Sequence, residues 1–331
     1  MSLLTGSRVL RNDGTLPAAL RGIASSAAYP TGEMHECRLR EENVISTPCG
    51  EVVPQYSAPD ARQKDLKSLS FYRSGKARSV CLDRQTEVRT PLGALPAELL
   101  VFYENGSLDS VFPLNGQLGF GWSEEEEGQL APYRDFSFPF GQFRVKVNGV
   151  RFYESGAVKS VIFWPGETVS LNTPAGTFPA RIGIRLYEDG ALHSFEPAAP
   201  IELDTPIGQA LAYDVNAVGV EADRNSVSFD RSGKLAGFAS SGDLVVSSPR
   251  QGRVRLSSLT RLGLSDDVLV KNPLVFSFEG DAVSVSDGKS ASSFDLRECK
   301  FLLLPDIDPG AGLGCGGRCG SAGSGGCSGC E

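Results

Sequence analysis

The stretch that decides the expected fold is Arg151-Phe-Tyr-Glu-Ser-Gly-Ala-Val-Lys-Ser-Val161. It is typical of a β-hairpin, because an aromatic strand end leads into a polar turn with Gly156 and then into an alternating strand. Three close copies and one weaker copy occur elsewhere: Phe71-Tyr-Arg-Ser-Gly-Lys-Ala-Arg-Ser79, Phe102-Tyr-Glu-Asn-Gly-Ser-Leu-Asp-Ser110, Leu186-Tyr-Glu-Asp-Gly-Ala-Leu-His-Ser194 and Phe229-Asp-Arg-Ser-Gly-Lys-Leu235. Such recurrence predicts an array of repeats.

A second phrase, Thr-Pro-x-Gly, alternates with the first. It stands at Thr47–Gly50, Thr90–Gly93, Thr173–Gly176 and Thr205–Gly208, with a degenerate copy at Phe138–Gly141. Proline presets φ for the second position of a turn, and glycine two residues later tolerates a positive φ. We therefore expect each hairpin unit to contain two turns, with the Glu-x-Gly turns along one edge of the sheet and the Thr-Pro-x-Gly turns along the other.

Between the turns, apolar residues alternate with polar ones, which is the period of a half-buried strand. We predict an all-β protein in which tandem β-hairpin repeats form an elongated, twisted meander sheet over residues 34–304. The alternative is a closed, propeller-like array, because about 40 residues per unit also suits four short strands per blade. Residues 1–33 are expected to be a loosely ordered extension. Residues 305–331, rich in glycine and cysteine, are expected to be a flexible tail.

The Phe/Tyr-Tyr-Glu-Asn-Gly-x-Leu-x-Ser phrase resembles the variant MORN repeat of many bacterial proteins. Phe102–Ser110 is the nearest match, and the phrase recurs over roughly residues 68–235. The resemblance implies tandem hairpins in an extended or curved sheet and a role in binding or scaffolding. The units here are longer and less regular than in that family, and Thr-Pro-x-Gly is not one of its hallmarks. The resemblance implies no substrate.

Composition restricts the classes of partner. The net charge is −8, whereas nucleic-acid binding and attraction to anionic membranes depend on an excess of Lys and Arg. No apolar run approaches the roughly 18–20 residues of a membrane span, and the N-terminus does not have the pattern of a signal peptide. We therefore expect a cytoplasmic protein that binds a protein partner, and neither nucleic acid nor a membrane.

The tail carries the candidate metal site. Cys315, Cys319, Cys327 and Cys330 place four thiols in a short glycine-rich segment. Four thiolates are the ligand set of a structural zinc ion or an iron–sulfur cluster, although the spacing matches no standard pattern of either. The alternatives are a disordered tail with reactive thiols, or a redox pair formed by Cys327 and Cys330.

Outside the tail, the cysteine, histidine and glutamate residues that could carry chemistry are interpreted as structural. Cys49 takes a turn position that holds Leu92 or Ile207 in other units, which indicates a small apolar filler. His35 and His193 are the two histidines, and neither has the partners of a catalytic triad or dyad. The run Glu124–Glu127 is interpreted as a solvated loop.

Two classes of function follow. The first is a non-enzymatic repeat or scaffold protein that binds a partner and holds a metal in its tail. The second is an enzyme, or a carrier of metal or sulfur, that uses the tail cysteines for redox chemistry or cargo transfer. The hairpin region offers no catalytic constellation in sequence, so the first class is preferred.

Overall fold

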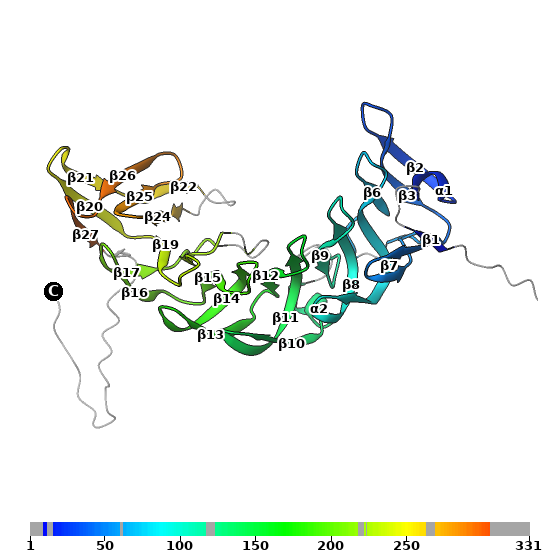
Figure 1. Cartoon of the computed structure of the whole chain (residues 1–331), viewed down its shortest axis with the longest axis horizontal. Coiled ribbons are helices and arrows are strands. Elements are labelled where there is room, and N and C mark those ends of the chain that lie inside the picture. The colour runs from blue at the N-terminus through cyan, green and yellow to red at the C-terminus, as the bar shows by residue number, and fades with distance from the viewer. Residues whose placement is uncertain are drawn as a thin grey trace, which may run out of the picture.

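The protein is an elongated all-β array, described here by a computed structural model that covers residues 9–11, 16–59, 62–116, 123–217, 222, 224–262 and 269–304. Its main body is one 17-stranded antiparallel meander sheet that is not closed into a barrel (Figure 1). The predicted meander is therefore confirmed, and the propeller alternative is wrong.

Fifteen of these strands follow one another across the sheet, each hydrogen-bonded to the next. In spatial order they are β2 (Ile23–Ala28), β3 (Met34–Leu39), β6 (Leu69–Phe71), β7 (Ala77–Thr90), β8 (Gly93–Phe102), β9 (Leu108–Phe112), β11 (Gly141–Phe152), β12 (Val158–Phe163), β14 (Gly176–Leu186), β15 (Leu192–Pro197), β18 (Val227–Phe229), β19 (Leu235–Ser240), β24 (Leu274–Glu279), β25 (Ala282–Ser286) and β26 (Ala291–Asp295). The remaining two, β10 (Tyr133–Phe138) and β13 (Thr168–Thr173), pair with the first halves of β11 and β14.

Smaller sheets complete the array. They are β1 (Val9–Arg11) with β4 (Val44–Thr47) and β5 (Gly50–Val52), the hairpin of β16 (Ile201–Thr205) and β17 (Gly208–Ala212), β20 (Asp243–Ser248) with β21 (Gly252–Leu256) and β27 (Lys300–Leu304), and β22 (Leu259–Leu262) with β23 (Leu269–Asn272). Two short helices, α1 (Leu16–Ala19) and α2 (Glu124–Gly128), are the helices of the described residues, and neither is long enough to cross a membrane.

The tyrosine of the first phrase ties each unit to the next. Each hydroxyl donates a hydrogen bond of 2.8–2.9 Å to a backbone carbonyl in the following unit. In the copies of the phrase the pairs are Tyr72 to Phe102, Tyr103 to Phe152, Tyr153 to Leu186 and Tyr187 to Phe229, and Tyr29, which precedes the first copy, makes the same bond to Phe71. Asp230 replaces tyrosine in the last copy of the phrase, so this series ends there.

The threonine of the second phrase closes its own turn. In each of the four copies its hydroxyl donates to the glycine carbonyl and accepts the N–H of the variable residue. Every glycine of these turns has a positive φ, between 95° at Gly93 and 134° at Gly176. The phrase is therefore a self-contained local structure, as its chemistry predicts.

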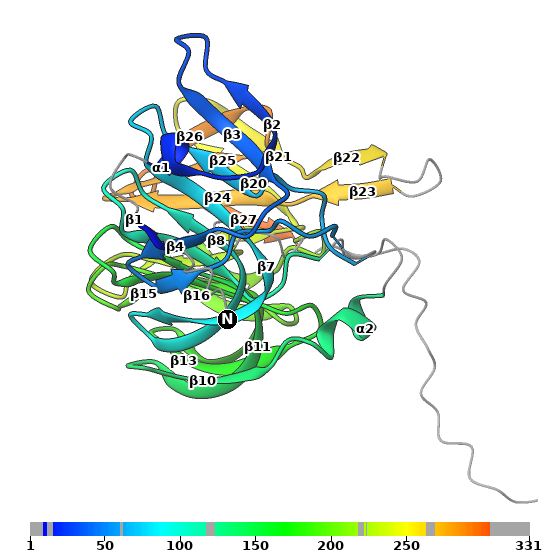
Figure 2. The ribbon, with the colours of Figure 1, turned by 90° about the vertical axis from the view of Figure 1, so that its right-hand side faces the viewer.

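The two kinds of turn do not lie at opposite edges. A Cβ built on Gly156 would lie 3.5 Å from Pro91 Cγ, and one on Gly233 would lie 3.3 Å from Pro174 Cγ, so a Thr-Pro-x-Gly turn packs against the Glu-x-Gly turn of a later unit. The expectation of separate edges is wrong because the long strands bend. Register shifts interrupt β7 after Cys81 and β14 after Arg181, and such bulges bend a strand. Figure 2 shows the resulting curvature.

Bending also builds the core. The first halves of the bent hairpins and the meander contribute to one continuous cluster of buried side chains, in which Leu171 and Ala180 join Phe152 and Phe195. The array extends before residue 34 as well, since β2 pairs with β3 and Leu16 is fully buried. The predicted start of the hairpin region at residue 34 therefore excludes β2, which is a strand of the large sheet.

Candidate functional site

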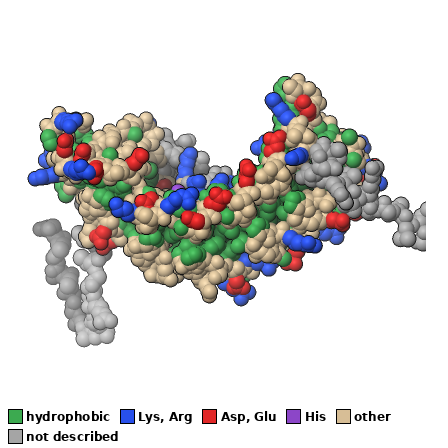
Figure 3. All heavy atoms as spheres, viewed as in Figure 1, with side chains coloured by type: hydrophobic (Ala, Val, Ile, Leu, Met, Phe, Trp, Pro, Cys, Tyr) green, Lys and Arg blue, Asp and Glu red, His purple; other side chains and the backbone are tan. Residues whose placement is uncertain are grey.

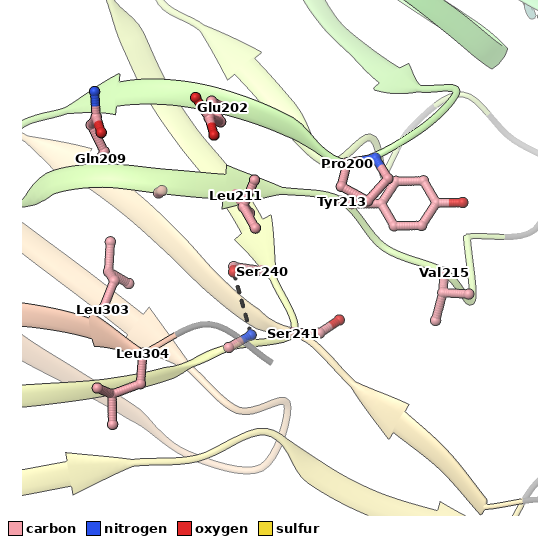
Figure 4. Close-up of a pocket in the computed structure, with 12 residues that line it drawn as sticks. Pro200, Glu202, Gln209, Leu211, Tyr213, Val215, Ser240, Ser241, Leu303 and Leu304 are labelled. Carbon is pink, nitrogen blue, oxygen red and sulfur yellow. Dashed lines mark hydrogen bonds between the residues drawn. The ribbon is translucent and has the colours of Figure 1, made fainter. Parts of the chain in front are cut away.

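A groove at the C-terminal end of the array is the candidate functional site. It lies between the β16–β17 hairpin on one side and β27 with residues 240–242 on the other, and has a volume of about 430 Å³. One wall carries Leu211 and Gln209, the other carries Leu303 and Leu304, and Pro200, Tyr213 and Val215 form one end (Figure 4).

Strand alternation explains why the groove is apolar. On β16 and β17 the side chains of Ile201, Leu203, Ala210 and Ala212 point to the core, so the residues between them must face outward. One of those outward residues is Leu211, whose side chain is 44% exposed. Leu211 and Val215, which is 61% exposed, both line the groove, so two apolar side chains of the groove stay accessible to solvent.

The half-buried side chain of Arg181 holds the tyrosine end of the groove in place. The Arg181 guanidinium stacks 4.8 Å from the centre of the Tyr213 ring and donates to the carbonyls of Pro197 and Asp214 at 3.1 and 2.7 Å. Its Nη2 lies 3.7 Å from Glu196 Oε1. The Tyr213 and Asp214 backbone is therefore fixed before any ligand binds, which lowers the entropic cost of binding.

Glu196 is itself anchored by the next strand of the sheet. Its carboxylate accepts the backbone N–H of Ser226 at 2.7 Å and the Ser226 hydroxyl at 2.9 Å. Burial raises the pKa of Glu196, while the bonds from Ser226 and the Arg181 charge act in the opposite direction. The side chain is fully buried, so this carboxylate supports the groove and does not contact a ligand in it.

Among the described residues that line the groove, one is charged, Glu202. The other lining side chains are apolar, or polar and uncharged, and Ser240 accepts the N–H of Gly242 at 3.4 Å within the floor. Such a lining suits apolar side chains accompanied by one basic group. In the view of Figure 3, by comparison, Lys and Arg side chains are interspersed with Asp and Glu over the array.

A second polar cluster lies inside the N-terminal half. Arg62 Nη2 donates to Glu98 Oε1 at 2.7 Å and Nη1 to Glu98 Oε2 at 3.1 Å, while the backbone N–H of Asn115 donates to the same Oε2 at 2.7 Å. Asn115 Nδ2 also donates to Cys81 Sγ at 3.2 Å. All four residues are buried. They join segments far apart in sequence, and this cluster acts as a structural anchor for the long loop after β9.

Glu127 also belongs to this cluster, although the run Glu124–Glu127 is expected from its sequence to be a solvated loop. The run Glu124–Glu127 forms α2, which begins with a capping box between Ser123 and Glu126. Glu127 is fully buried, and Nη1 of Arg62 lies 3.5 Å from its Oε1. Burial raises the pKa of Glu127. The interpretation of the whole run as a solvated loop is therefore wrong at this residue.

The predicted metal ligands Cys315, Cys319, Cys327 and Cys330 lie outside the described residues. Within the described ranges, no group of three or more His, Cys, Asp or Glu side chains is arranged to hold a metal ion. Cys37, Cys49 and Cys81 are buried free thiols, and burial raises the pKa of each to about 11. Cys49 is thus the apolar filler that its turn position indicates.

Both histidines pack on tyrosines at equivalent positions. The ring of His35 lies edge-on to Tyr29 with centroids 4.6 Å apart, and that of His193 lies edge-on to Tyr187 at 4.7 Å. Other units place a cation over the ring at this position, as Lys159 does over Tyr153. Both histidines therefore take part in ring packing on a tyrosine.

Sequence reasoning missed the groove and the buried glutamates. A signal for the groove was present in Leu211, an outward apolar residue between two inward alanines, and in the consecutive leucines Leu302–Leu304 of the last strand. Glu98 interrupts an otherwise apolar strand, which is a signal for a buried charge that needs a partner, whereas Glu196 follows the polar His193 and Ser194 and gives no such signal. Nothing in sequence indicates that Arg62 and Arg181 are those partners.

Comparisons of the chain with protein-family models, with curated proteins and with solved structures find no match. The class that the geometry itself defines is an open all-β array of tandem hairpins with an apolar groove at one end.

Proposed function

We propose that the protein is a non-enzymatic scaffold whose groove binds an apolar segment of a partner protein, with a basic residue of that segment opposite Glu202. The observation that carries the proposal is the apolar groove itself, with Leu211 and Val215 exposed beside a preformed Tyr213 end. Leu211 is 44% exposed, so burying its remaining surface at an interface contributes on the order of 1 kcal/mol, about half of what a fully exposed leucine would give.

The same proposal assigns the tail a metal, zinc or an iron–sulfur cluster, held by Cys315, Cys319, Cys327 and Cys330. The last described strand supports a link between the two features, because Leu303 and Leu304 line the groove and the tail follows them directly. We also propose that the protein is cytoplasmic. Its buried thiols Cys37, Cys49 and Cys81 are unpaired, which is typical of a reducing compartment.

A peptide library displayed on phage and selected on the full chain tests the groove. We expect enrichment of peptides with several apolar side chains and at least one Lys or Arg. Calorimetric titration of the enriched peptides should give a Kd raised at least about 10-fold by Leu211→Asp. Glu202→Gln should weaken only the peptides that carry a basic residue.

Leu92→Asp is the matched control, since Leu92 is also an exposed leucine but lies on the Thr90–Gly93 turn, away from the groove. It should leave the Kd unchanged. If no peptide is enriched, or if Leu211→Asp and Leu92→Asp behave alike, the groove is not the binding site.

The tail is tested separately. The full chain and a variant with serine at positions 315, 319, 327 and 330 are purified anaerobically, and zinc, iron and acid-labile sulfide are measured per chain. We expect metal only in the wild-type chain. Equal metal content in both would rule out the tail site while leaving the groove proposal intact.

A further inference from the structure

The β2 edge of the large sheet is open. β2 (Ile23–Ala28) is the first strand of the sheet and pairs with β3 on one side only. In an antiparallel pair every second residue points its N–H and C=O away from the partner strand. These outward groups of β2 make no hydrogen bond to another strand in the described part of the chain. Figure 1 shows β2 and β3 as a hairpin that projects at one end of the array.

This edge lacks the charges and the proline that usually discourage pairing, although a register shift at Ala24 bends the strand. Natural edge strands carry charges or proline, or are covered by another element. β2 has neither a charged residue nor a proline, and its residues after Ile23 are exposed alanines and serines. The opposite edge strand, β26, differs, because it ends in Asp295 and carries the buried Phe294.

We propose that β2 pairs with β2 of a second copy of this chain, antiparallel about a two-fold axis at Ser26. Such an axis places Ser26 opposite its own counterpart, Ser25 opposite Ala27 and Ala24 opposite Ala28. Every opposed pair is then small and uncharged, so the backbones can approach to hydrogen-bonding distance without a clash or a repulsion. The large sheet continues across the dimer.

The sheet already uses the same contact inside one chain. Ser70 and Ser79 are opposed on β6 and β7, and their hydroxyls are hydrogen-bonded at 2.6 Å. The segment in regular register is short, because register shifts interrupt the β2–β3 pairing on both sides of Ser25–Ala27. We therefore infer a dimer that dissociates on dilution and not a permanent one.

Sedimentation velocity of the full chain over a wide concentration range tests the inference. The wild-type protein should shift from monomer to dimer as concentration rises. Ser26→Lys and Ser26→Glu should each be monomeric over the same range, because like charges then meet at the axis. An equimolar mixture of the two variants should regain the dimer, since Lys opposes Glu. Circular dichroism spectra and Tm values of both variants establish that they are folded.

Ser293→Lys on the opposite edge strand is the matched control and should dimerise like the wild type. A wild-type protein that remains monomeric at every concentration overturns the inference. So does a Ser26→Lys variant that still dimerises, or a Ser293→Lys variant that is monomeric. If the mixture of charged variants stays monomeric while the wild type dimerises, the proposed two-fold pairing at Ser26 is wrong. A partner peptide that occupies β2 of a strictly monomeric protein would likewise contradict self-pairing.

Discussion

The hydroxyl of Tyr103 donates a 2.9 Å hydrogen bond to the carbonyl of Phe152, 49 residues further along the chain. The equivalent bond from Tyr72 to Phe102 spans 30 residues. The unit that contains Tyr103 therefore accommodates a long additional loop without changing how it meets its neighbour. The contact that defines the spacing of the array is conserved from unit to unit, while loop length is not.

Removing this hydroxyl should weaken the junction between two units. We expect Tyr103→Phe to lower the free energy of unfolding by about 1 kcal/mol, because the Phe152 carbonyl loses its partner while the ring remains. Urea denaturation followed by circular dichroism measures the change. Tyr133→Phe is the control, since Tyr133 is 47% exposed and its hydroxyl donates to Glu167 at 3.2 Å, and it should be nearly neutral. Equal losses of unfolding free energy in the two variants would mean that the Tyr103–Phe152 hydrogen bond stabilises the fold no more than the Tyr133–Glu167 bond does.

The buried pair of Arg62 and Glu98 should be much more sensitive. Arg62→Met leaves the Glu98 carboxylate buried without its cation, and breaking a buried pair in this way costs about 3–5 kcal/mol. Arg231→Met breaks the exposed pair with Asp189 and should cost no more than about 1 kcal/mol. Chemical denaturation of both variants gives the comparison. A loss for Arg62→Met as small as that for Arg231→Met would contradict the anchoring role.

Glu127 should make stability depend on pH. Because burial raises its pKa in the folded chain, its favourable contribution is complete below the unfolded pKa and is lost as pH rises through the folded value. Glu127→Gln cannot ionise and avoids this loss. The stability of Glu127→Gln relative to the wild type should therefore increase from pH 4 to pH 7.5, as measured by urea unfolding at several pH values. A difference that does not change with pH would show that Glu127 titrates normally.

Three thiols should be unreactive in the native protein. Burial raises the pKa of Cys37, Cys49 and Cys81 to about 11, so very little thiolate is present at pH 8 and reagents cannot reach it. Iodoacetamide labelling followed by peptide mass spectrometry should modify these residues only after unfolding in urea. Cys299, which is half-buried, serves as the internal comparison and should react earlier. Rapid native labelling of Cys37 would refute the expected protection.

Local chemistry made the hairpins predictable. The glycines at 106 and 156 adopt the positive φ that a tight turn needs, and each Thr-Pro-x-Gly phrase forms its hydrogen bonds within four residues. Alternation of apolar residues identified the strands for the same reason, since side chains on a strand point alternately to its two faces. These features depend on neighbours in the chain, so an open all-β array could be predicted from the sequence.

Long-range contacts determine where the strands bend, where the groove lies and which charges are buried. The bulges that bend β7 and β14 bring Pro91 against Gly156 and Pro174 against Gly233, and no local pattern indicates where a strand will bend. The burial of Glu127, the stacking of Arg181 on Tyr213 and the placement of Leu211 and Leu304 on opposite walls of the groove depend on segments far apart in sequence. Only the tertiary structure therefore placed the groove and the buried charges, because burial and pairing are properties of the packed array and not of any one hairpin.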